Sequence, residues 1–136
     1  FSSIFVILIS MRQTRVIFFG LVVLFLLGYT GGWWGGTWYI EIGNTYFHFI
    51  GGLGIALLVA SYYATQFGKL SQLLRFFCVL GMTIGVGVLW EFHEYVLGQI
   101  LPVSLQGDLD DTMKDLLMDT LGGVVGALYS FRSRNS

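Results

Sequence analysis

Residues 73–97 read LLRFFCVLGMTIGVGVLWEFHEYVL, a long apolar run that carries two glutamates near its end. A helix needs roughly 20 predominantly apolar residues to cross a bilayer, and this run is long enough. Three further apolar runs lie at residues 16–34, 46–64 and 109–131. Surface helices of soluble proteins carry a broad polar face, and these runs carry very few polar residues. The sequence therefore predicts an all-α fold, an integral membrane four-helix bundle.

The composition of the 136-residue chain supports the same prediction. Hydrophobic residues make up 55% of the chain and charged residues 11%, whereas a typical soluble domain has about 25% charged residues. So few charges exclude a water-soluble domain, a disordered chain and a basic nucleic-acid-binding protein. A lone cysteine, Cys78, excludes an intrachain disulfide framework. We expect a multi-pass protein of the cell membrane, in contact with membrane lipid and without a nucleic-acid partner.

The basic residues predict the orientation of the four spans. Six of the seven lie beside run ends that share one side of the membrane: Arg12, Arg15, Lys69, Arg75, Arg132 and Arg134. The positive-inside rule makes that side cytoplasmic, so both termini are predicted to be cytoplasmic. The loops at 35–45 and 98–108 are then extracytoplasmic. Aromatic side chains before the second span are expected to form an outer interfacial belt, made of Trp33, Trp34, Trp38 and Tyr39.

The expected domain organisation follows from these spans. Residues 1–15 form an N-terminal extension in which Met11 is a candidate natural start, residues 16–131 form one transmembrane domain, and residues 132–136 form a short basic tail. Small residues let membrane helices approach closely. The glycines of the last three spans are therefore expected to be packing positions: Gly51, Gly52, Gly54, Gly81, Gly85, Gly87, Gly122, Gly123 and Gly126.

The acidic residues gather on the side opposite to the basic ones. All eight fall in the outer loops or the outer halves of the spans: Glu41, Glu91, Glu94, Asp108, Asp110, Asp111, Asp115 and Asp119. At about 100° per residue, Glu91 and Glu94 fall on one helical stripe with Gly87, and His93 points away from it. His48 begins the second span at the same outer end. We therefore predict that these polar faces turn toward one another.

Helix phase and depth make these groups candidates for function. Asp111, Asp115 and Asp119 cover roughly 80° of arc on the last span, and the deeper acids would lie roughly 5–15 Å below the outer surface. An ionisable side chain at that depth costs about 2.5–3.5 kcal/mol and indicates a functional site by default. A hydrogen-bonded network that only holds the helices together is the alternative. Asp108, Asp110 and Asp111 open the last helix, where one of them is expected to be the N-cap and acids favour the helix dipole.

Three segments carry a resemblance to a known family. They are NTYFHFIGG at residues 44–52, LWEFHEY at residues 89–95 and GDLDDTMKDLLMDTLGG at residues 107–123. Together they resemble the YjdF-like family of small inner-membrane proteins, which is broadly similar to the VanZ-like family. The resemblance implies the same membrane architecture and supports a site at His48, Glu91, Glu94, Asp111 and Asp115. It implies no reaction. Asn44 departs from the family pattern, in which an aspartate is common.

The preferred hypothesis is a divalent metal site. Its expected ligands are one imidazole and four carboxylates, those of His48, Glu91, Glu94, Asp111 and Asp115. Such a set suits Mg²⁺, Mn²⁺, Zn²⁺ or Fe. A hydrolase or transferase acting on a lipid-linked substrate would then use Asp119 as the catalytic acid or base.

Two other classes of function fit the same residues. A non-catalytic accessory or scaffold subunit of a larger membrane complex, or a homo-oligomer, agrees with the small size and the lack of a soluble domain. Handling of protons or cations by the buried carboxylates is the other alternative, because such groups titrate in a low-dielectric interior. The inner halves of the spans carry few polar residues, which disfavours a complete pathway across the membrane.

Overall fold

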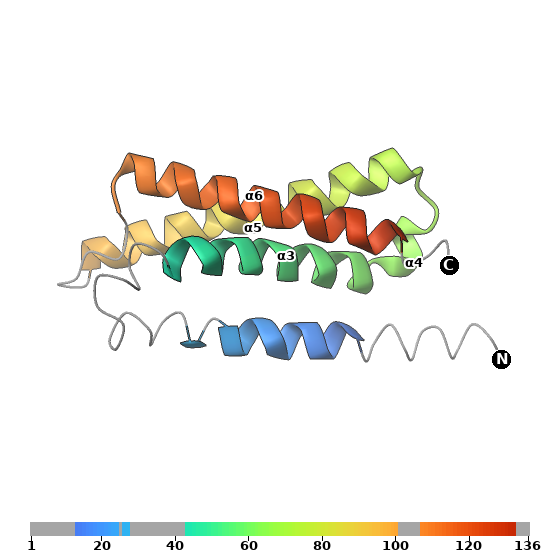
Figure 1. Ribbon diagram of the computed structural model, residues 1–136, viewed down its shortest axis with the longest axis horizontal. Coiled ribbons are helices and arrows are strands. Elements are labelled where there is room, and N and C mark those ends of the chain that lie inside the picture. Colours follow the sequence, from blue (N-terminus) through green and yellow to red (C-terminus); the bar gives the residue numbers. More distant parts are fainter. Residues whose placement is uncertain (1–12, 25, 28–42, 101–106, 133–136) are drawn as a thin grey trace.

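The computed structural model describes residues 13–24, 26–27, 43–100 and 107–132, with side chains described up to residue 130 (Figure 1). All regular structure in this described part is helical, as predicted. The helices are Gln13–Leu24, α3 at Asn44–Tyr62, α4 at Ala64–Phe67, α5 at Gln72–Ile100 and α6 at Leu109–Arg132. The aromatic belt, Glu41 and most of the two outer loops fall outside the described residues.

The long helices agree closely with the predicted runs. α3, α5 and α6 begin and end within three residues of the runs at 46–64, 73–97 and 109–131. The first predicted run begins inside the helix Gln13–Leu24, and its end at residue 34 lies outside the described residues. The short helix α4 was not predicted. It turns the chain between α3 and α5 and buries Phe67 against them.

α3 and α6 run parallel to each other, and α5 runs in the opposite direction beside them (Figure 1). The helix Gln13–Leu24 lies along α3, where the Thr14 hydroxyl donates a hydrogen bond to Ser61 Oγ at 3.1 Å (Figure 1). The starts of α3 and α6 and the end of α5 consequently lie at the same end of the molecule. Residues His48, Glu91 and Asp115 belong to that end.

Glycines set the close approach of α3 and α6. A Cβ atom at Gly52 would collide with the backbone carbonyl of Asp119, and one at Gly122 would collide with the backbone of Phe49. A Cβ atom at Gly126 would lie 2.7 Å from the Cβ of Ala56. Gly122 and Gly126 are four residues apart, the spacing at which small residues form one ridge of close helix contact in membrane proteins. The two backbones therefore touch directly.

The expectation that every glycine is a packing position was only partly right. Gly87 and Gly123 contact side chains of neighbouring helices, as expected. A Cβ atom added at Gly51, Gly81 or Gly85 would meet nothing within 4 Å, so these three glycines line open surface instead. The physical reason is helix phase, because these three glycines lie on faces that point away from the helix contacts.

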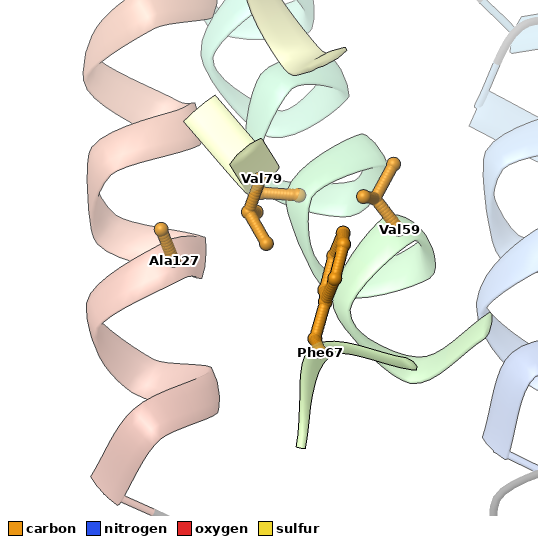
Figure 2. Close-up of a cluster of buried hydrophobic side chains, with 5 residues drawn as sticks. Val59, Phe67, Val79 and Ala127 are labelled. Atoms are coloured by element: carbon orange, nitrogen blue, oxygen red, sulfur yellow. The ribbon is translucent and has the colours of Figure 1, made fainter. Parts of the chain in front are cut away.

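Apolar side chains lie largely on the outside. The buried hydrophobic core is small and lies near the ends of α3 and α6, where Val59, Phe67, Val79 and Ala127 meet (Figure 2). On α5, by contrast, Leu73, Phe77, Leu89 and Phe92 are 58–69% exposed. Soluble proteins rarely expose apolar surface on this scale. This distribution suits a helix surrounded by lipid.

Two described helices, α3 and α5, are long and apolar enough to cross a membrane. Little of either helix is buried within the protein, which distinguishes them from the core helices of soluble proteins. α6 has a comparable length and carries acids in its first half. Those acids, together with His48 and Glu91, form the polar region described next.

Candidate metal centre

Three helices each contribute one buried ionisable side chain to the same place. His48 lies near the start of α3, Glu91 toward the end of α5 and Asp115 near the start of α6. Their exposed fractions are 6%, 5% and 1%. One ligand atom from each lies within 4.8 Å of the other two. The structure thus brings together three of the five side chains predicted to bind a metal.

The helix contacts explain why these three side chains meet. His48 lies one helical turn before Gly52 on α3, and Asp115 lies one turn before Asp119 on α6. Because Gly52 packs directly against the backbone of Asp119, the contact between α3 and α6 places His48 and Asp115 on facing surfaces. α6 starts at a defined residue because Asp108 Oδ1 accepts a hydrogen bond from the Asp111 backbone N–H at 3.0 Å. This is the predicted N-cap, an acceptor for an otherwise unpaired helix donor. It fixes the register in which α6 presents Asp115.

Hydrogen bonds hold one oxygen of each carboxylate. The Asn44 amide donates to Asp115 Oδ2 at 2.7 Å, and His48 Nε2 lies 3.5 Å from the same oxygen. The Thr112 side chain also interacts with the Glu91 carboxylate. Sequence reasoning did not assign a contact to Asn44 or Thr112. Their positions offered a signal, because Asn44 precedes His48 by one helical turn and Thr112 precedes Asp115 by nearly one.

The other oxygen of each carboxylate has no such partner. Glu91 Oε1 and Asp115 Oδ1 are fully buried, and no described residue donates a hydrogen bond to either. Burial of an unpaired carboxylate oxygen is costly, so buried charges in proteins are paired or coordinate metals. A cation bound between Glu91 and Asp115 would remove that cost. These two oxygens are the clearest sign of a ligand in the described residues.

Asp119 contacts the opposite side of the imidazole. Its Oδ2 lies 3.2 Å from His48 Nδ1, and its side chain is buried between α3, α5 and α6. With a proton on Nδ1, His48 donates a hydrogen bond to Asp119, and the lone pair of Nε2 points to the side of Asp115. Asp119 thus faces the histidine and not the two unpaired carboxylate oxygens.

Glu94 and Asp111 lie beside the three buried groups without joining them. Both side chains are half-buried. Glu94 Oε1 accepts a hydrogen bond from Trp90 Nε1 at 2.9 Å, and Asp111 forms an ion pair with Lys114 on its own helix. Glu94 is close enough to His48 to interact with it electrostatically.

The remaining polar residues agree with their expected places. His93 is exposed and packs its ring against Trp90, with ring centroids 5.1 Å apart, so it points away from the cluster as predicted. Asp110 is exposed in the first turn of α6. Neither residue contributes to the buried group.

The donor set favours a divalent metal of intermediate softness. One imidazole nitrogen and two carboxylate oxygens suit Zn²⁺, Mn²⁺ or Fe²⁺, since imidazole ligands are uncommon at sites for harder cations. Three protein ligands leave at least one coordination position for water or a substrate, as in catalytic zinc sites. The described residues therefore define a helical membrane protein with a candidate metal centre.

Comparison with known proteins gives the family. The chain matches, over residues 1–136, the family described as "Predicted membrane protein (DUF2238)", and it belongs to that family. It is also similar to an uncharacterized protein of Thermotoga maritima, with 41% identity over 59 residues that make up 41% of this chain. The match spans 31% of that relative's length. No solved structure matches the chain. The prediction of a membrane protein is confirmed, whereas the resemblance to the YjdF-like family stays a prediction.

Proposed function

We propose that this membrane protein binds one divalent metal ion through His48 Nε2, Glu91 and Asp115. The observation that supports the proposal most strongly is the pair of buried carboxylate oxygens, Glu91 Oε1 and Asp115 Oδ1, that no described residue satisfies. They lie beside an imidazole whose other nitrogen already contacts Asp119. Glu94 and Asp111 remain candidate ligands, each able to replace its present partner when a metal binds.

The proposed topology is a four-span bundle in the cell membrane with both termini in the cytoplasm. The helix directions support it, because the starts of α3 and α6 and the end of α5 lie together and carry the acids. The opposite end carries Arg15, Lys69 and Arg75, as the positive-inside rule requires of the cytoplasmic side. The metal would then lie below the outer surface, within reach of lipid headgroups.

This placement suggests a class of reaction. A metal with an open coordination position activates water or polarises a phosphoryl oxygen. A lipid-linked substrate in the outer leaflet would reach such a centre from the end of α5 and the start of α6. We therefore propose a metal-dependent hydrolase or transferase acting on a lipid-linked substrate, with membrane lipid as the immediate partner of the protein.

Metal analysis of the purified protein tests the central proposal. The protein is purified through a tag without histidine, loaded with Zn²⁺ or Mn²⁺, desalted, and assayed for metal per chain. We expect one metal per chain in the wild type and in Asp110→Asn, an exposed acid on the same helix. Glu91→Ala and Asp115→Ala should each lose the metal. Equal metal content in all four proteins would remove the proposal.

A tag-accessibility experiment tests the topology separately. Labels at both termini should react only after the membrane is permeabilised, and a label in the segment at residues 101–106 should react in intact cells. A terminus that is labelled from outside contradicts the proposed orientation, whatever the metal content.

A further inference from the structure

We propose that Asp119 is a positioning residue, which holds His48 so that Nε2 faces the metal, and that Gly87 provides the space for its carboxylate. This inference rests on the proposed metal centre and replaces the role of acid or base that the sequence suggested for Asp119. It assigns a function to a glycine on α5 that lies one helical turn before Glu91.

The contact geometry separates Asp119 from the ligands. His48 uses its two ring nitrogens in different directions, with Nδ1 3.2 Å from Asp119 Oδ2 and Nε2 3.5 Å from Asp115 Oδ2. Metal-binding histidines almost always donate the proton of the second ring nitrogen to a carboxylate, a carbonyl or water, which fixes both the tautomer and the ring orientation. Asp119 is placed to accept a hydrogen bond from the Nδ1–H of His48.

Burial makes this arrangement rigid. The residue Asp119 is only 7% exposed, and its backbone carbonyl lies directly against Gly52 on α3. α3 thereby holds both His48 and the backbone of the residue that orients it. An imidazole in contact on both edges has one preferred orientation. A metal that binds Nε2 then meets a ligand that is already in place.

Gly87 determines where the carboxylate can lie. A Cβ atom at Gly87 would lie 2.6 Å from Asp119 Oδ2 and 3.2 Å from Asp119 Cγ. Any side chain at position 87 would therefore push the carboxylate away from α5 and change its contact with His48. Gly85, two residues earlier on the same helix, has nothing within 4 Å of its Cβ position. Gly85→Ala is consequently a matched control for the backbone effect of replacing a helical glycine.

The test measures Zn²⁺ affinity and the coordinating nitrogen in a His93→Gln background. The chain has two histidines, so this background leaves His48 as the sole imidazole. Titration calorimetry gives the affinity, and ¹⁵N spectra of the Zn²⁺-loaded protein show whether Nε2 or Nδ1 binds the metal. The variants are Asp119→Ala, Asp119→Asn, Gly87→Ala and Gly85→Ala.

We expect Asp119→Ala and Gly87→Ala to weaken Zn²⁺ binding by about 10–100-fold, the usual effect of losing such a partner. The imidazole of Asp119→Ala should also lose its single mode of coordination through Nε2. Asp119→Asn keeps a hydrogen-bond acceptor for Nδ1–H, so it should retain Nε2 coordination and recover part of the affinity. Gly85→Ala should match the background.

Three outcomes would overturn the inference. If the background protein binds Zn²⁺ and Asp119→Ala leaves both affinity and Nε2 coordination unchanged, Asp119 does not position His48, and the metal proposal stands. If Asp119→Asn behaves like Asp119→Ala in both measurements, the hydrogen bond is not the cause. If the background protein binds no Zn²⁺, the metal proposal and the inference fall together. Should Gly87→Ala fail to fold, the two Asp119 variants still decide.

Discussion

The direct backbone contact between α3 and α6 makes Gly122→Ala the most informative packing variant. Its new Cβ atom would lie 2.7 Å from the Leu53 backbone nitrogen and 3.1 Å from the Phe49 carbonyl carbon, and closer still to the Phe49 carbonyl oxygen. Favourable contacts between carbon atoms occur at about 3.5–4.0 Å. Backbone atoms of a helix cannot move aside alone, so the two helices must separate.

The expected cost follows from that separation. A gap of about 0.5–1 Å forfeits a quarter to a half of each dispersion contact along the crossing, and overpacking of this kind costs about 1–3 kcal/mol. We expect Gly122→Ala to lower the free energy of unfolding by about 2 kcal/mol, a roughly 30-fold change in the unfolding equilibrium. Separation also moves His48 away from Asp115, so Zn²⁺ affinity should fall as well.

Reversible unfolding in mixed detergent micelles, followed by circular dichroism, measures the stability, and calorimetric titration measures the Zn²⁺ affinity. Gly51→Ala is the matched control, because it replaces a glycine of α3 that has nothing within 4 Å of its Cβ position. Unfolding of Gly122→Ala at the same denaturant concentration as Gly51→Ala would refute a tight backbone contact between α3 and α6.

Three further predictions concern the centre and the helix that carries it. Zn²⁺ at about 100 times its dissociation constant should stabilise the wild type by about 2.7 kcal/mol in a thermal unfolding assay, and a similar gain in Glu91→Ala would contradict binding at this site. In calorimetry, Asp111→Asn and Glu94→Gln should weaken Zn²⁺ binding less than Asp115→Asn does, because the side chains of Asp111 and Glu94 already have partners outside the buried group. The reverse order would make Asp111 and Glu94 the principal ligands. Asp108→Ala removes the cap of α6, so it should lower the free energy of unfolding by about 1 kcal/mol without changing the Zn²⁺ stoichiometry. Loss of the bound metal in this variant would show that the cap alone holds the centre together.

Much of the fold was predictable because one physical rule governs it. Helices in lipid must be apolar over a fixed length, so the apolar runs predicted the first and last residues of α3, α5 and α6 to within three residues. Helix phase then placed His48, Glu91 and Asp115 on facing surfaces, which the structure shows as three buried groups. Composition likewise predicted the membrane protein that the family description supports.

Helix phase alone could not rank the polar residues. Glu94 and Asp111 lie on the predicted faces, and each has a partner within its own helix, Trp90 and Lys114. Local contacts three or four residues apart compete with contacts between helices, and the spacing of the acids does not reveal which contact prevails. The same limit applies to Asn44, whose amide reaches Asp115 on another helix.

Glycine content was also an incomplete guide to packing. Gly51 and Gly52 are adjacent, yet only Gly52 contacts the backbone of α6. Successive helical residues differ by about 100° in direction, so a one-residue difference decides between close packing and open surface. The crossing point of α3 and α6 requires knowledge of both helices together.

Anomalous diffraction from crystals of the Zn²⁺-loaded protein tests the central claim most directly. We expect one strong anomalous peak per chain, about 2.0–2.2 Å from His48 Nε2 and from one oxygen each of Glu91 and Asp115. A loaded protein whose only zinc peak lies elsewhere, or one without a peak between these three side chains, would contradict a metal centre at this place.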